Sequence, residues 1–162
     1  MLGFALTTVS GAWGQSGSVG SSVLSLTVSA ESAIRLDVPR VALARLGGKA
    51  FGGDTSLTWK VRTQTVGGSG DITVKLTSAF PTGSSSAADE LTFECMAASR
   101  GAGCTGSQFV SATRAVTVVR FNSGAHSAPG GDSGSIRWKL KNEPPCGEET
   151  CEAIATFTIS SN

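Results

Sequence analysis

The sequence has few of the residues on which most catalytic and metal sites depend. It contains no tyrosine and a single histidine, His126, and only 15% of its residues are charged. One histidine limits metal and acid–base chemistry, and a formal net charge of +1 projects no field that would attract nucleic acid. No stretch reaches the ~20 continuous apolar residues that cross a bilayer. We therefore expect no cofactor, no nucleic-acid partner and no membrane span in the mature chain.

Lysine and arginine are also missing before Arg35, so the apolar N-terminal segment lacks the charged start of an export signal. A start codon placed too late would explain this. Small residues follow the apolar stretch, and Ala12-Trp13-Gly14 offers a small-x-small cleavage site. We expect residues 1–15 to be an export signal and residues 16–22 a flexible Gly/Ser arm. The alternative is that residues 4–9 form a first strand of the mature fold.

Glycine, serine and threonine are abundant, which disfavours long helices and supplies turns. Apolar residues make up 40% of the chain and occur in short alternating groups, so the low charge does not indicate disorder. A chain of 162 residues is long enough for one domain with its own core. We expect that single domain to cover residues 23–162.

Apolar and polar residues alternate from Val23 almost to the C-terminus, which is the period of strands with one buried face. Further apolar groups with this spacing lie at residues 34–38, 57–61, 72–76, 91–95, 116–118, 136–140 and 153–159. About nine short strands without an amphipathic helix predict an all-β, two-sheet antiparallel immunoglobulin-like sandwich. Gly67–Gly70 predicts a hairpin between the 57–61 and 72–76 strands, and the glycine pairs at 47–48 and 52–53 predict a flexible connection.

Four cysteines occur as two close pairs, Cys95 with Cys104 and Cys146 with Cys151. An even number in local pairs favours two disulfides and an oxidised, extracytoplasmic compartment. A four-thiolate zinc site is the competing interpretation. It is disfavoured because the eight residues between Cys95 and Cys104 exceed the gaps of zinc knuckles.

Three groups of residues are candidates for a site. Gly130-Gly131-Asp132-Ser133-Gly134 is similar to the nucleophile segment of chymotrypsin-like proteases, but His126 in the same loop is the only histidine, and an ordinary turn has the same composition. Trp59 and Trp138 share their phase with apolar neighbours, which predicts buried rings rather than a sugar-stacking platform. The opposite phase carries cations that form a basic face if their strands share a sheet, or that merely solvate it: Lys60, Arg62, Lys75, Arg137, Lys139 and Lys141.

The layout of the chain resembles that of secreted bacterial fibre subunits, the chaperone-usher pilins and spore-coat-U-like proteins. The resemblance is carried by the flexible arm and alternating strand of residues 16–28 and by the terminal strand of residues 153–159. Two departures are that the chain lacks the penultimate tyrosine and the single early disulfide common in pilins.

The resemblance implies assembly by strand addition, in which the N-terminal strand of one subunit completes the sheet of the next. Leu24, Leu26 and Val28 would then fill apolar slots between the sheets, and identical subunits would form an open, head-to-tail polymer. We expect a secreted structural subunit of a surface filament or coat and not an enzyme. Two alternatives remain: a monomeric module that binds a host protein, glycan or surface polymer through its loops or basic face, and a hydrolase that uses Ser133.

Overall fold

The computed structural model of the chain describes residues 22–28, 33–47, 50–80, 91–141 and 151–161. Within these ranges the chain is all-β, without a helix, which confirms the all-β part of the predicted fold class. The strands are β1 (Ser22–Val28), β2 (Ala33–Leu36), β3 (Arg40–Gly47), β4 (Ala50–Lys60), β5 (Gly70–Ser78), β6 (Leu91–Ala98), β7 (Ala102–Gly103), β8 (Ser107–Phe109), β9 (Val116–Phe121), β10 (Asp132–Leu140) and β11 (Cys151–Ser161).

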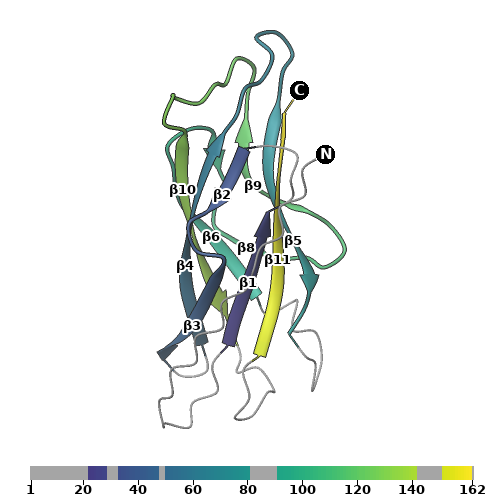
Figure 1. Ribbon diagram of the computed structural model, residues 1–162. Helices are drawn as coiled ribbons and strands as arrows, with labels where there is room; N and C mark the ends of the chain where they lie inside the picture. Colours follow the sequence, from purple (N-terminus) through teal and green to yellow (C-terminus); the bar gives the residue numbers. More distant parts are fainter. Residues whose placement is uncertain (1–21, 29–32, 48–49, 81–90, 142–150, 162) are drawn as a thin grey trace, which may run out of the picture.

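The strands form one curled sheet in the order β7-β9-β5-β11-β1-β3-β4-β10-β6-β8, with β2 beside β4 (Figure 1). We call β7, β9, β5, β11 and β1 the first half, and β2, β4, β10, β6 and β8 the second half. β3 joins them, because residues 40–43 pair with β1 and residues 44–47 with β4.

The sheet differs from the prediction of two antiparallel sheets in two respects. β3 makes it continuous, and β1 runs parallel to β11. A parallel pair cannot be closed by a short hairpin. Here it needs no such turn, because the two strands come from opposite ends of the chain.

Gly52 and Gly53 lie inside β4, so the flexible connection predicted there is wrong. Both glycines sit where β3 leaves β4 and turns towards β1. A Cβ at Gly53 would lie 2.6 Å from a methyl of Val41 and 3.0 Å from the carbonyl oxygen of Ala42. Glycine is therefore required at this corner for close approach of two strands, and not for flexibility.

We expect Gly53→Ala to lower the free energy of unfolding by about 1–3 kcal/mol, because the added methyl must displace packed backbone. Gly130→Ala is the matched control, since a Cβ there meets nothing within 4 Å. Its effect should stay within about 0.5 kcal/mol. Urea unfolding measures both, and equal stabilities for the two variants would contradict the close approach.

The predicted hairpin between residues 57–61 and 72–76 is also wrong. β4 pairs with β10, β2 and β3, whereas β5 pairs with β11 and β9. The segment between them carries the chain from the second half of the sheet to the first. A glycine-rich turn between two alternating strands indicates that the chain reverses, but it leaves open whether the strands pair with each other.

The two ends of the strand order are held together on the side opposite β3. β7 pairs with β9 and β8 pairs with β6, yet only three residues separate β7 from β8. A disulfide joins Cys95 of β6 to Cys104, and the amide of Cys104 donates a 2.9 Å hydrogen bond to the carbonyl oxygen of Val118 in β9. The disulfide therefore fastens the second half of the curled sheet to the first.

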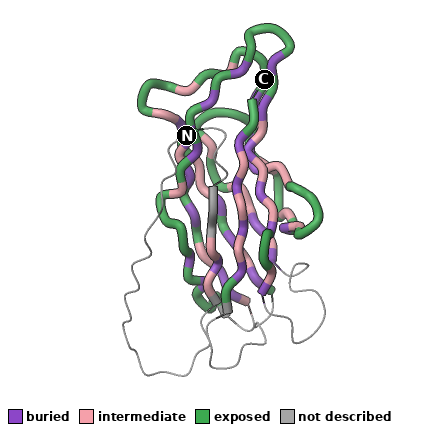
Figure 2. The backbone as a smooth tube through the Cα atoms, turned by 45° about the vertical axis from the view of Figure 1, so that its right-hand side comes forward, coloured by how far each residue is buried: buried purple, intermediate pink, exposed green. Residues whose placement is uncertain are grey.

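The core fills the space inside the curl, where burial alternates along the strands (Figure 2). Trp59 and Trp138 are 1% and 0% exposed, which confirms their predicted inward direction. The indole nitrogen of Trp138 donates a 2.8 Å hydrogen bond to the hydroxyl of Thr55. The rings of Phe93 and Phe157 pack at 5.9 and 6.2 Å from that of Trp138.

Several predictions concern parts of the chain that the structure does not describe. The export signal at residues 1–15, nearly all of the arm at 16–22, and the pairing of Cys146 with Cys151 lie outside the described residues. Among the described segments, no helix is long and apolar enough to pass through a membrane, and no three potential metal ligands come together.

Candidate assembly site

The N-terminal strand β1 lies in a slot between β11 and β3. Along its whole length it pairs with β11 in parallel, from Ser22 opposite Cys151 to Val28 opposite Phe157. On its other side, residues 22–25 pair with β3. β1 thus closes the gap between the last strand of the chain and the strand at which the sheet turns.

The alternation of β1 places Leu24 in the core. Its side chain is fully buried, and its register partners are Ala153 of β11 and Val41 of β3. Ala153 and Ala155 are fully buried too, and their small side chains leave room beside β11 for larger ones on β1. Leu26 is in register with Ala155 and Val28 with Phe157. The side chains of these two β1 residues lie outside the described set.

An ion pair passes over the outward face of β1. Arg40 of β3 is opposite Ser25, and Glu152 of β11 is opposite Val23. Their side chains meet at 3.7 Å, Nη2 to Oε1, so the two strands that flank β1 are connected across it. Neither partner was selected by the sequence analysis, because Arg40 and Glu152 are 112 positions apart in the chain.

We expect Glu152→Gln to lower the free energy of unfolding only slightly, by less than about 1 kcal/mol, because the side chains of Arg40 and Glu152 are both exposed. The loss should shrink at high salt, which screens exposed charges. Urea unfolding at two salt concentrations measures it, and the exchanged pair Arg40→Glu with Glu152→Arg should restore stability. A loss that is independent of salt would contradict an electrostatic role.

The predicted basic face is divided by the fold. Lys75 is on β5 in the first half, whereas Arg137 and Lys139 are on β10 in the second. Arg137 Nε donates a 3.0 Å hydrogen bond to Asp54, and this hydrogen bond, with the charge of Asp54, raises the pKa of Arg137. Lys139 Nζ lies 2.7 Å from Glu94. Acidic neighbours on β4 and β6 therefore neutralise the middle of the predicted face.

Lys60 and Arg62 remain exposed at the end of β4, and within the described part of the chain neither has an ion-pair partner. Arg35 of β2 belongs with them, because Ala33 pairs with Lys60 and Arg35 follows on the same face. The sequence analysis missed Arg35, since its strand is distant in the chain and only pairing brings it beside β4. Lys141 is exposed at the opposite end of β10.

The Gly-Asp-Ser-Gly segment leads into β10, which begins at Asp132. Asp132 is buried and accepts a 3.3 Å hydrogen bond from the hydroxyl of Ser99, while Nε of Arg100 lies 3.3 Å from its other carboxylate oxygen. The amide of Ser133 donates to the Ser99 hydroxyl at 2.8 Å. These contacts attach the start of β10 to the segment after β6, which is a structural role.

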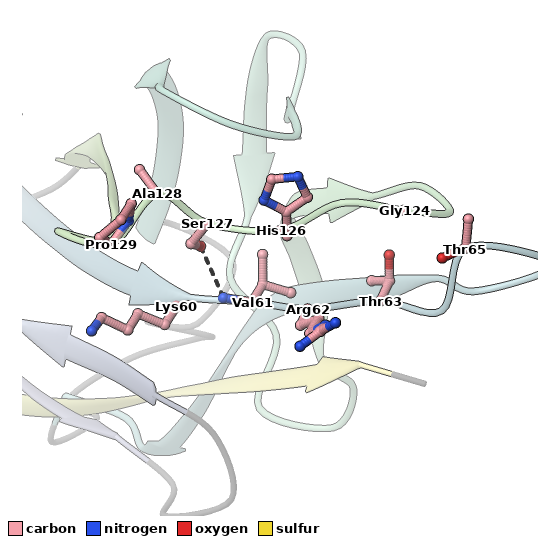
Figure 3. A pocket seen from close by; sticks show the side chains of 10 residues that line it. All are labelled: Lys60, Val61, Arg62, Thr63, Thr65, Gly124, His126, Ser127, Ala128 and Pro129. Carbon is pink, nitrogen blue, oxygen red and sulfur yellow. Dashed lines mark hydrogen bonds between the residues drawn. The ribbon is translucent and has the colours of Figure 1, made fainter.

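His126 lines a different surface from Ser133. It borders a hollow of about 660 Å³ at the loop end of β4, whereas Ser133 borders another on the outer face of the second half. Figure 3 shows the ring of His126 on one side of the chain and the guanidinium of Arg62 on the other. His126 and Ser133 therefore border separate hollows, and that of His126 is lined by Lys60 and Arg62 as well.

Comparison with known proteins gives no assignment for the chain. No family model matches it, and no curated protein matches it.

Proposed function

We propose that this chain is a secreted structural subunit of a surface filament or coat, and that subunits join by strand addition. In this proposal the curled sheet acts as an immunoglobulin-like sandwich, and the slot between β11 and β3 receives residues 22–28 of a neighbouring copy. An incoming strand would be held by backbone hydrogen bonds on both sides.

The position of β1 is the observation that carries the proposal. It is the first described strand, it pairs with the last one, and it contributes a fully buried leucine without being enclosed by a hairpin. A strand that precedes the other described strands and fills a gap among them is also able to fill the same gap in another copy. A contact of that kind does not close on itself when each copy both gives and receives a strand.

Deletion of residues 15–29 should abolish polymers, as judged by negative-stain microscopy and sedimentation. Because the deletion also removes a core strand, a synthetic peptide of residues 22–28 is added back to the deleted chain. The peptide should restore the β-sheet signal in circular dichroism and leave the protein monomeric. Polymers formed by the deleted chain would refute strand addition, and Ser25→Ala in the full chain is the control that should still polymerise.

A further inference from the structure

A shallow hollow on the outer face of the second half of the sheet is lined by small and hydroxyl-bearing side chains. Its volume is about 460 Å³, which is within the range of sites for small molecules. The lining comes from β4, β6 and β10 and from the residues that follow β2 and β6. We call it the serine hollow, and its main polar and small side chains are those of Asp37, Ser56, Ala97, Ser99, Ser133 and Ser135.

Strand pairing fixes the positions of the serines in this hollow. Ser135 of β10 is in register with Ser56 of β4 on one side and with Ala97 of β6 on the other. Ser133 lies two residues earlier on the same face of β10. The amide of Ser99 donates a 2.8 Å hydrogen bond to its carbonyl oxygen, and its own amide donates one of 2.8 Å to the hydroxyl of Ser99. Neighbouring strands lie about 5 Å apart and alternate residues of a strand about 7 Å apart, so the serines form a fixed pattern.

Gly134 supports this pattern from the inner side of the sheet. A Cβ at Gly134 would lie 2.8 Å from Cη2 of Trp59, so the glycine lets the indole ring pack directly against the backbone between Ser133 and Ser135. The ring of Trp59 is itself 1% exposed and belongs to the core. Backbone held in this way presents its outward hydroxyls in place, which lowers the ordering cost of binding a ligand.

Several polar groups of the hollow have no partner among the described residues. The hydroxyls of Ser56, Ser133 and Ser135 make no hydrogen bond there, and the carboxylate of Asp37 makes neither a hydrogen bond nor an ion pair. The backbone of Asp37 is nevertheless held, because its amide donates a 3.1 Å hydrogen bond to the carbonyl oxygen of Ser56. Hydroxyls both donate and accept, and a carboxylate accepts. Together they match a ligand that is itself rich in hydroxyl groups.

The charges around the hollow nearly balance, which favours an uncharged ligand. Arg35 lies two residues before Asp37, and both are exposed, so the cation offsets the carboxylate. Lys60 borders the hollows further along β4 and not this one. The remaining charged side chains of the adjoining described residues are in ion pairs, Arg100 with Asp132 and Arg137 with Asp54. The hollow therefore has no field of one sign that would select a polyanion or a polycation.

We infer that the serine hollow binds a neutral glycan. A sugar ring carries several hydroxyls on a rigid frame, and these can donate to Asp37 and exchange hydrogen bonds with the serines. Recognition depends on hydrogen bonds and not on stacking, because Trp59 and Trp138 are buried. An extended peptide would instead bind at a strand edge, where main-chain groups are free. The hollow is separate from the slot between β11 and β3, so this inference goes beyond the proposed function and does not depend on it.

The test measures binding of the full chain to immobilised neutral oligosaccharides of glucose, mannose, galactose and N-acetylglucosamine, with sulfated and uronic-acid oligosaccharides beside them. The neutral oligosaccharide that binds best is then titrated against variants. Asp37→Ala removes the acceptor, and Ser135→Val replaces a hydroxyl with methyl groups inside the hollow. Each should weaken binding by about tenfold or more. Asp71→Ala and Ser107→Val make the same changes on β5 and β8, outside the hollow, and should bind like the wild-type chain.

Asp37→Asn keeps the shape of the side chain and one acceptor oxygen, so its affinity should lie between those of the wild-type chain and Asp37→Ala. Absence of binding to every neutral oligosaccharide would overturn the inference, and so would equal binding by the hollow variants and their controls. Preference for the sulfated or uronic-acid oligosaccharides would indicate a polyanion site and overturn it as well. Negative-stain microscopy scores polymers separately. Variants that lose glycan binding should still polymerise, so the failure of either proposal can be told from the failure of the other.

Discussion

Leu24→Glu is expected to abolish polymers and to lower the free energy of unfolding by at least about 4 kcal/mol, because it places an unpaired carboxylate in the core. Leu24 is fully buried opposite Ala153 and Val41. Leu24→Ala should cost about 3 kcal/mol through the cavity it leaves beside these small side chains. Urea unfolding of the monomer measures both losses, and sedimentation of the assembled material measures the effect on polymers.

The control for Leu24 is its neighbour on the same strand. Ser25 lies in the opposite phase and is only half-buried, so Ser25→Ala should change stability by less than about 0.5 kcal/mol. Comparing the Leu24 and Ser25 variants tests which face of β1 points into the core, as well as whether β1 is needed. Polymers of normal length from Leu24→Glu would show that β1 is not the assembling strand.

The alternation of apolar residues was sufficient to predict β1 and β2 to within two residues and to predict which way Leu24, Trp59 and Trp138 face. This succeeds because the direction of a side chain on a strand depends only on its own phase. Neighbouring strands are not needed for that prediction. The alternation is a local property of the sequence, so it also predicted the central residues of β5 and β10.

Strand partners could not be predicted in the same way. β3 was missed because alanines occupy its outward positions, so Val41-Ala42-Leu43-Ala44 shows no contrast between apolar and polar residues. Its change of partner from β4 to β1 depends on Gly53, whose role becomes visible only when both strands are in place. A glycine pair has the same appearance in sequence at a loop and at a close approach.

The candidate sites show the same limit. The phase of residues along each strand groups Lys75 with Arg137, but their strands lie in different halves of the sheet. Charge partners such as Asp54 and Glu94 come from strands far away in the chain, and they neutralise Arg137 and Lys139. Arg35 lies near Lys60 for the same reason, through the pairing of β2 with β4.

The disulfide between Cys95 and Cys104 is expected to contribute strongly to the stability of the fold. Replacing both cysteines with alanine should lower the free energy of unfolding by about 2–3 kcal/mol, since the nine-position separation closes a short loop and constrains the unfolded chain. Local unfolding should increase first where β9 pairs with β7, because Cys104 and Gly103 contact Val118 and Val119 there. Hydrogen exchange at these amides should accelerate before that of β4 and β10.

Treatment with a reductant distinguishes the contribution of this disulfide to stability from that of the second cysteine pair. Wild-type protein treated with dithiothreitol should lose at least as much stability as the Cys95→Ala/Cys104→Ala variant, and any further loss of the variant in dithiothreitol reports Cys146 and Cys151. If the variant unfolds at the wild-type urea concentration, the curled sheet does not depend on this covalent connection. Its two ends would then be held by the short β7 and β8 pairings, which offer five register pairs between them, and by backbone hydrogen bonds such as that from the amide of Leu76 to the carbonyl oxygen of Ser111.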